Sequence, residues 1–401
     1  MSDMETREVK LGNIVKHNKG YAFKSSEYTD KGVMVVRVTD FTLDSISDAD
    51  AVYLAPDDRY DKFILKTNDI LIQTVGSWAN NPNSIVGKVV RVPKLCDNAY
   101  LNQNIVRIIP NNDLDNTYLF YALKANHFST YCVLRGQGAA NQASITLDTI
   151  FRFKFKAHNF TAQQRIAGIL SAYDNLIENN NKRIHLLEQM AENLYKEWFV
   201  RFRFPGYEDV DFENGIPNGW KIERLSDIAD IIMGQSPESE NYNTNCEGLP
   251  FHQGVGSYGE FYLIDDVYST KGNRIAEANS IIFSVRAPVG RINITLNKII
   301  LGRGVAAINS AKGYNAYLLW MLKNQFQQED IIGNGSIFAS VTKKELFGFK
   351  ILMPNEDLIQ KFDSIASGIE REMRKISLIN SNLKKQRDML LPRLMSGKLE
   401  V

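Results

Sequence analysis

The sequence has few cysteines and no long apolar run. Three cysteines occur among 401 residues, Cys96, Cys132 and Cys246, and no two of them form a Cys-x-x-Cys pair. An odd, scattered set of cysteines argues against a disulfide framework and against a zinc site. The chain begins with the polar, charged stretch MSDMETREVK, which is unlike a secretory signal. We therefore expect a protein of the reducing cytoplasm with no membrane-spanning segment.

The sequence also lacks an excess of charge of either sign. Lysine and arginine together number 47 and aspartate and glutamate 46, which gives a net charge of +1. A protein that binds nucleic acid without regard to sequence is usually more basic, so any contact with DNA must be a local patch. The hydrophobic fraction of 44% is typical of a soluble globular protein, and a chain of this length is expected to form two or three domains.

Catalytic motifs are missing as well. Neither His-Glu-x-x-His nor Gly-x-x-x-x-Gly-Lys-Ser/Thr occurs, and the five histidines have no metal-ligand spacing. The stretch GVGSYG, Gly254 to Gly259, fits Gly-x-Gly-x-x-Gly, but the residues after it read as a strand rather than a phosphate-binding helix. We therefore predict that the chain holds no metal and catalyses no reaction by itself. These absences oppose the alternative of a DNA methyltransferase or nuclease that acts alone.

A doubled pattern is what the sequence does contain. The stretch GQGAANQASIT, which begins at Gly136, is matched by GNGSIFASVT, which begins at Gly333. The segment that leads to Gly20 resembles the one that leads to Gly234, and YLFYALK resembles YLLWMLK. Between these stretches the chain alternates strand, polar loop and strand. The repeat predicts an α+β protein with two similar α/β domains in tandem.

A long helical segment with heptad spacing follows each half. Five heptads of apolar residues favour coiled-coil helices, and roughly 40 residues make about 60 Å of helix. Unpaired, each helix would expose a stripe of leucine and isoleucine, so we expect the two helices to pair antiparallel. We assign the following residues to the seam: Ile166, Leu170, Tyr173, Ile177, Asn180, Ile184, Leu187, Ala191, Leu194, Trp198, Phe362, Ile365, Ile369, Ile376, Ile379, Leu383 and Leu390.

Polar residues and helix ends complete this prediction. Asn180, Glu372 and Gln386 fall in the seam, where polar residues usually fix the register. Thr161 and Gln164 have capping-box spacing and are predicted to begin the first helix. Ile169, Leu176 and Met190 widen its apolar face, which favours either packing on its own domains or a docking surface for another protein. The predicted parts are a first domain over 1–158, a first helix over 159–204, a second domain over 205–354, and a second helix with the tail over 355–401.

Polar and aromatic residues are concentrated in the loops between predicted strands. Glutamine, asparagine, arginine and lysine are the side chains that read base edges, so we predict that these loops contact DNA. For any one of these residues the alternative is an ordinary solvated loop position. The candidates in the first half are Lys19, Lys24, Gln73, Ser77, Trp78, Asn80, Asn81, Arg135, Gln137, Asn141 and Gln142. The candidates in the second half are Gln235, Ser236, Tyr242, Gln253, Arg286, Arg291, Arg303, Asn334 and Ser336.

Each Gly-x-Gly stretch ends in a threonine that is predicted to cap a short helix. Thr342 and Glu345 have capping-box spacing, and Asp148 places an acid in the first turn after Thr146. The glycines let the backbone turn tightly and approach a partner closely. A capped helix start suits a phosphate, whereas a plain strand-to-helix turn is the alternative.

Taken together, these stretches resemble the specificity subunit of type I restriction-modification enzymes. The similarity covers nearly the whole chain. It rests on NDILIQTVGS, GKVVRV and LNQNIVRI with their counterparts ANSIIFSVRAPVGRI and RGVAAI, and on the two Gly-x-Gly stretches. It rests equally on FTAQQRIAGILSAYDNLIENN, LYKEWF and the closing LKKQRDMLLPRLMSGKLEV.

The resemblance implies a function for each part. It implies two target recognition domains that each read one half of a split DNA sequence, and antiparallel helices that measure the unread gap. It implies two methyltransferase subunits docked on this chain, restriction and translocase subunits outside them, and S-adenosylmethionine, ATP and magnesium on those partners. Since the loops of the two halves differ, we expect an asymmetric target. A two-lobed coiled-coil adaptor without DNA specificity is the alternative.

Overall fold

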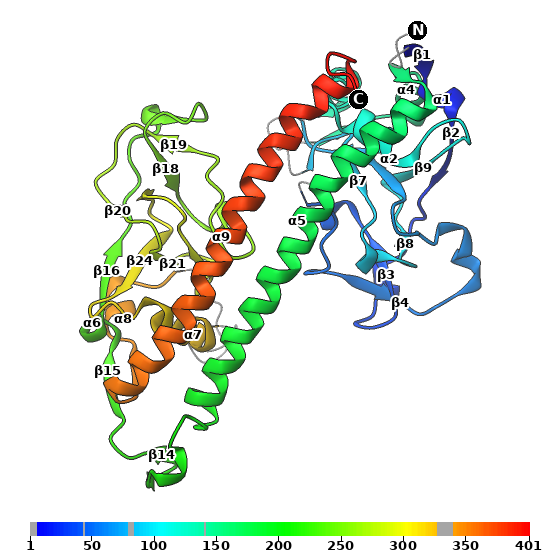
Figure 1. The fold of residues 1–401 in the computed structure, drawn as a ribbon. Helices are drawn as coiled ribbons and strands as arrows, with labels where there is room; N and C mark the ends of the chain where they lie inside the picture. The colour runs from blue at the N-terminus through cyan, green and yellow to red at the C-terminus, as the bar shows by residue number, and fades with distance from the viewer. Residues whose placement is uncertain (1–5, 43–44, 79–83, 140–141, 327–339) are drawn as a thin grey trace. The chain divides into compact units, whose positions relative to one another are not determined.

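The protein forms two compact units. A computed structural model describes residues 6–42, 45–78, 84–139, 142–326 and 340–401. The first unit comprises Met1–Glu178 together with Asn380–Val401, and the second comprises Asn179–Ile379. Each long helix therefore contributes one part to each unit (Figure 1). None of the helices in the described ranges is long and apolar enough to cross a membrane.

A four-stranded antiparallel sheet is the centre of the first unit. Its strands are, in order, β2 (Val15–Lys19), β9 (Ile105–Pro110), β5 (Ile70–Gln73) and β7 (Val89–Arg91). Beside it are β4 (Val52–Leu54), β3 (Val33–Val36) and β8 (Tyr100–Leu101), and then β10 (Gln137–Ala139), β11 (Gln142–Ser144) and β6 (Val75–Gly76). The remaining elements are β1 (Thr6–Lys10), β12 (Lys154–His158), α1 (Leu11–Ile14), α2 (Asn116–Lys124), α3 (Asn126–Arg135) and α4 (Leu147–Phe151).

The second unit repeats this arrangement. Its four-stranded sheet is β16 (Ala229–Met233), β24 (Val305–Ser310), β21 (Ile281–Ser284) and β22 (Ile292–Ile294). Its five-stranded sheet is β17 (Tyr242–Asn243), β19 (Tyr268–Ser269), β18 (Leu249–His252), β23 (Ile299–Leu301) and β20 (Ile275–Ala276). The remaining elements are β13 (Phe212–Glu213), β14 (Ile216–Pro217), β15 (Lys221–Arg224), β25 (Lys350–Met353), α6 (Leu225–Ile228), α7 (Asn315–Phe326) and α8 (Lys343–Phe347).

The predicted duplication is confirmed by the strand pairing. The sheet β2–β9–β5–β7 corresponds to β16–β24–β21–β22, and the parallel pair β3–β8 corresponds to β18–β23. In both units the central strand is buried on both faces. Ile281 and Phe283 join one hydrophobic cluster while Ile282 joins another, because successive side chains of a strand point to opposite faces.

The predicted caps of the two short helices are also confirmed. The Thr146 side chain accepts a hydrogen bond from the Thr149 amide at the start of α4. Thr342 and Glu345 form a complete capping box at the start of α8, and the hydrogen bonds to Thr342 lower the pKa of the Glu345 carboxyl. These caps end the turn from the preceding segment and fix where each helix begins.

Two long helices follow the domains. Helix α5 spans Phe160–Tyr195 and continues as a π-helical turn over Lys196–Val200, and α9 spans Glu356–Met395. The prediction of a Thr161 cap was wrong. Asn159, two residues earlier, caps α5, since its Oδ1 accepts a hydrogen bond from the Ala162 amide at 2.9 Å. Asn355 caps α9 in the same way, through the Leu358 amide at 3.0 Å.

The helices pair antiparallel within each unit. In the first unit the start of α5 contacts the end of α9: Arg165 donates to the Val401 carbonyl at 3.2 Å, and Arg387 pairs with Asp174 at 2.6 Å. In the second unit the end of α5 contacts the start of α9, where the Trp198 and Phe362 rings lie 5.9 Å apart. In each unit the apolar face of the helix pair joins the core of the domain in that unit.

The two helices correspond residue by residue in the repeat. A residue of α5 matches the residue of α9 whose number is higher by 196, as the first residues Phe160 and Glu356 show (160 + 196 = 356). In α5 the assigned seam residues are buried or half-buried. In α9 the prediction was wrong for Ile365 and Ile379, which are 44% and 43% exposed. The buried series is Ala366, Met373, Asn380, Arg387 and Leu394, and Glu372 and Gln386 each lie one residue before it.

Candidate nucleic-acid interface

Four chain segments meet at one place in the second unit. After β16, the Gly234 amide donates to the Val305 carbonyl at 3.0 Å and the Gln235 amide to the Leu301 carbonyl at 2.9 Å. After β18, the Gln253 carbonyl accepts from the Gly304 amide at 3.0 Å. These hydrogen bonds gather the ends of β16 and β18 around the turn between β23 and β24.

The segment after β21 joins the same place. The Val285 amide donates to the Gly304 carbonyl at 2.9 Å, and the Val285 carbonyl accepts from the Val341 amide at 2.8 Å. Arg286 also forms an isolated bridge with Ser340. The exposed residues where these four segments meet are Gln235, Gln253, Arg286 and Arg303, and we call these four the second loop cluster.

Glycine is required where these segments cross. A Cβ atom on Gly234 would lie 2.1 Å from the Gly302 carbonyl oxygen, and one on Gly304 would lie 2.2 Å from the Gln253 carbonyl oxygen. Both distances are far shorter than any real contact, so a side chain at either position would push the segments apart. The glycines therefore permit the close backbone approach on which the cluster depends.

The side chains of the second loop cluster are exposed and are not bonded to other residues that the structure describes. Gln235, Gln253, Arg286 and Arg303 all face solvent. Within the part of the chain that the structure describes, their side chains make no hydrogen bond or ion pair. Ser236 differs, because its Oγ accepts a hydrogen bond from the Arg303 amide at 3.1 Å. The arrangement offers two guanidinium groups and two amides to a ligand.

A buried histidine supports this surface. His252 precedes Gln253 and is fully buried. Its Nδ1 lies 2.7 Å from Ser257 Oγ and its Nε2 lies 2.9 Å from Asp265 Oδ1, while Asn297 donates to the other carboxylate oxygen at 2.7 Å. The chain of hydrogen bonds fixes the backbone that presents Gln253. This role of His252 cannot be predicted from local sequence, because its partners Ser257 and Asp265 come close to it only in the fold.

The first unit contains a matching place. The Gly20 amide donates to the Ile105 carbonyl at 3.0 Å and the Tyr21 amide to the Leu101 carbonyl at 2.9 Å, as Gly234 and Gln235 do to Val305 and Leu301. The pairs Asn102–Val36, Thr74–Asn104 and Ile145–Thr74 likewise match Gly302–His252, Val285–Gly304 and Val341–Val285. The positions that correspond to the second loop cluster hold Tyr21, Arg37, Val75 and Gln103, and we call these the first loop cluster.

The predicted contact residues of the first half are distributed around this place. Pairing of β11 with β6 brings the exposed Gln142 close to the half-buried Ser77 and Trp78. Lys19, Lys24, Arg135 and Gln137 are exposed, and the Arg135 guanidinium lies 4.1 Å from the centre of the Tyr131 ring. Asn80, Asn81 and Asn141 lie outside the described residues.

Gln73 is not available for contact with DNA. Its side chain is fully buried, and its Nε2 donates to the carbonyls of Val75 at 2.8 Å and Ser84 at 3.1 Å. It closes the loop that follows β5, which explains why a polar residue occupies the end of a buried strand. Tyr21, Arg37, Val75 and Gln103 were not among the predicted contact residues, because only the match between the two units identifies them.

The predicted contact residues of the second half divide in the same manner. Arg291 is exposed at the end of the loop after β21, and its amide donates to Ser284 Oγ at 2.8 Å. Tyr242 is half-buried: its ring stacks on Phe251 with centroids 4.6 Å apart, and its hydroxyl donates to the Pro237 carbonyl at 2.8 Å. Tyr242 thus supports the fold rather than presenting a free polar group. Asn334 and Ser336 lie outside the described residues.

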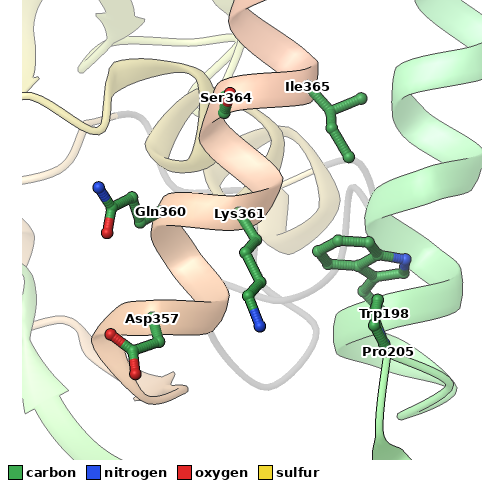
Figure 2. A pocket seen from close by; sticks show the side chains of 7 residues that line it. All are labelled: Trp198, Pro205, Asp357, Gln360, Lys361, Ser364 and Ile365. Carbon is green, nitrogen blue, oxygen red and sulfur yellow. The ribbon is translucent and has the colours of Figure 1, made fainter.

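A different surface is formed by the helices in the second unit. An open groove of about 620 Å³ is lined by Trp198 and Pro205 after α5 and by the first turns of α9. Figure 2 shows Trp198 and Ile365 pointing into the space between the two helices, with Lys361 beside them. On the rest of α5, Leu186 and Met190 are 64% and 58% exposed. Large apolar side chains exposed along a helix mark a surface suited to another protein.

Fold and site together define a class of protein: two repeated α/β domains, each with its own loop cluster, carried on a pair of long helices. Comparison with known proteins gives the family. The family described as "Type I restriction modification DNA specificity domain" matches residues 1–189 and 217–386. The chain belongs to this family and is a specificity subunit of the type I restriction-modification kind.

Relatives agree with this assignment. The chain is 31% identical over 352 residues to the putative type I restriction enzyme MjaX specificity subunit of Methanocaldococcus jannaschii, covering 85% of this chain and 80% of that protein. It is 22% identical over 411 residues to the type I restriction enzyme HindI specificity subunit of Haemophilus influenzae, covering 84% and 88%. The crystal structure of the type I restriction-modification S subunit from M. genitalium has the same fold, with a TM-score of 0.56, 17% identity and coverage of 98% and 96%.

Proposed function

We propose that this chain reads a bipartite, asymmetric DNA sequence and directs a methyltransferase to it. One domain reads each half of the target, and the paired helices set the unread gap. The observation that supports this most directly is the occurrence of two loop clusters with the same backbone framework. The two frameworks share their backbone hydrogen bonds, whereas the side chains that they present differ.

The framework and the side chains have separate tasks in this proposal. Backbone hydrogen bonds and glycines hold the segments, so the presented residues can change without loss of the fold. Arginine and glutamine make paired hydrogen bonds to guanine and adenine in the major groove. Basic residues near the clusters, such as Lys19 and Lys24, would contact phosphates, which position the protein without reading sequence. The near-neutral net charge implies that partner subunits share the binding of phosphates.

The same proposal covers the partners. Two methyltransferase subunits would dock on the helices, one in each unit, with restriction and translocase subunits outside them. The groove beside Trp198 and the exposed Leu186 and Met190 offer apolar contact area in the second unit. Leu176 and Met389, which are 52% and 67% exposed, offer it in the first. We assign S-adenosylmethionine, ATP and magnesium to those subunits, and we infer that this chain is non-catalytic and works in the cytoplasm.

A genome-wide methylation map tests the proposed function. Cells with and without this gene would be compared by single-molecule sequencing, with the methyltransferase gene present in both. We expect one split, asymmetric motif to lose its methylation when the gene is absent. An unchanged map, with a methyltransferase that is expressed and active on another specificity subunit, would contradict the proposal and favour an adaptor without DNA specificity.

A further inference from the structure

The two loop clusters present different chemistry on the same framework. At the four matching positions the second cluster has Gln235, Gln253, Arg286 and Arg303, whereas the first has Tyr21, Arg37, Val75 and Gln103. Since the backbone is held alike in both, the difference in side chains is the difference in what each domain can recognise. This comparison rests on the proposed function and extends it to the bases themselves.

Arginine occupies two of the four positions of the second cluster. Arg286 and Arg303 are exposed, and neither guanidinium has a protein partner among the described residues. Arg303 follows Gly302, whose amide is bound to the His252 carbonyl at 2.8 Å, so its backbone is anchored while its side chain is free. A free guanidinium fork on a fixed backbone suits the O6 and N7 acceptors of guanine. The flanking Gln235 and Gln253 suit adenine.

The single arginine of the first cluster, Arg37, is bound to other residues of its own domain. Arg37 donates to Asp40 Oδ1 at 2.8 Å and to the Asp50 carbonyl at 2.6 Å, and the Asp40 side chain is 2% exposed. The guanidinium therefore stabilises a turn within the domain and is not presented to a ligand. The first cluster therefore has no free guanidinium group that corresponds to those of Arg286 and Arg303.

Apolar groups and one amide remain in the first cluster. Tyr21 is 42% exposed, and its ring is held against Tyr60 and Phe63 with centroids 5.2 and 5.3 Å away. Val75 is half-buried, and Gln103 is exposed without a partner in the described residues. Glutamine suits adenine, and apolar side chains suit the methyl group of thymine.

We propose that the two halves of the target differ in base composition in a defined direction. The second domain specifies a half-site that contains guanine, read by Arg303 and Arg286. The first domain specifies its half-site through adenine and thymine, with Gln103 on an adenine and Tyr21 with Val75 on thymine methyl groups. The asymmetry of the target thus follows from which residues occupy one shared framework.

Substitutions at matching positions test this proposal. Methylation maps would be made for cells that express the wild-type chain, Arg303→Ala, Arg303→Lys or Gln103→Ala with the methyltransferase. We expect Arg303→Ala to relax one guanine of one half-site, with discrimination at that base reduced roughly 5- to 150-fold. Arg303→Lys should relax the same base although it keeps the charge, because it loses the paired hydrogen bonds. Gln103→Ala should relax an adenine in the other half-site.

Two controls separate base reading from loss of fold or of overall affinity. Lys24→Ala removes an exposed charge outside the clusters and should lower methylation at all sites without changing the motif. Thermal unfolding of the purified variants should match that of the wild type, since all these side chains are exposed or half-buried.

The outcomes are distinct. If Arg303→Ala leaves every guanine required, or changes the half-site that Gln103→Ala changes, the base assignment is overturned while the proposed function stands. A wild-type chain that directs no methylation at all would overturn the function, and with it the base assignment.

Discussion

Glu370, on the long helix α9, is a carboxyl group in an unfavourable environment. Burial, followed by the nearby Asp363, raises its pKa from the ordinary value of 4.5 to about 8, against the opposing effects of Trp320 and Lys323. Its Oε1 has no hydrogen-bond partner among the described residues. The residue of the first unit that matches Glu370 is Asp174 (174 + 196 = 370). Unlike Glu370, Asp174 is paired with an arginine, Arg387. Glu370 is therefore protonated in the folded protein near neutral pH.

This pKa has a consequence for stability. A group with a higher pKa in the folded than in the unfolded state contributes stability that is complete below about pH 4.5 and is lost as the pH rises through about 8. Glu370→Gln keeps the shape and removes the titration. We expect the free energy of unfolding of the variant, relative to wild type, to rise between about pH 5 and about pH 9. Chemical denaturation over this range measures it.

The control for this prediction lies on the same helix. The Glu372 side chain is 41% exposed and lies 3.6 Å from Arg183. The difference between Glu372→Gln and wild type should change much less with pH. Equal pH dependence in the two variants would show that burial at Glu370 does not govern its protonation.

A buried polar contact distinguishes one helix pair from the other. In the first unit Asp174 accepts from Tyr121 Oη at 2.5 Å and from Arg387 at 2.6 Å, and the Arg387 side chain is only 7% exposed. In the second unit the residue that matches Arg387 is Ala191 (191 + 196 = 387), which is fully buried. Polar residues in a coiled-coil seam are best known for fixing register, and here Tyr121 extends that contact from the helices to the domain.

A double-mutant cycle measures this contact. Arg387→Ala and Asp174→Ala should each destabilise the chain, by up to about 3–5 kcal/mol, because each breaks a buried ion pair. Asp388, whose Oδ1 lies 2.8 Å from Arg387 Nη2, should lessen the loss in Asp174→Ala. The double variant should be less destabilised than the sum of the two, as expected for residues that act together. Urea denaturation provides the three free energies of unfolding.

The pair Arg7 and Asp113 is the control, because its side chains are 64% and 59% exposed. The coupling free energy of this pair should be less than about 1 kcal/mol. If the destabilisation of the double variant equals the sum of the two single values, Asp174 and Arg387 do not stabilise the protein as an interacting pair.

How far the sequence predicts these elements depends on whether the signal is local. The capped starts of α4 and α8, the heptads of α5 and the duplication itself depend on residues close in the chain, and each was predicted. The buried series of α9 was not predicted, because two of its positions hold Asn380 and Arg387, and polar or charged residues are not expected in a core. The loop clusters were found only in part, because Tyr21 and Gln103 are 82 residues apart and meet only through backbone hydrogen bonds.

At the scale of the whole molecule, the paired helices make a quantitative prediction about DNA. Seven residues inserted after Glu178 and seven after Ile379, at the boundary of the two units, preserve the heptad register of both helices. The insertion lengthens each helix by about 10.5 Å, which corresponds to about three base pairs at roughly 3.4 Å each.

We expect this variant to methylate the same two half-sites with a gap wider by about three base pairs, as read from a methylation map. An insertion of four residues at the same two points is the matched control. It shifts the seam residues away from each other, and we expect it to abolish methylation instead of producing an intermediate gap. The half-sites themselves should be unaffected by the longer variant, because both loop clusters are built entirely within the domains. An unchanged gap in a folded seven-residue variant would mean that the spacing of the half-sites is set elsewhere, by the partner subunits or by the DNA, and not by α5 and α9.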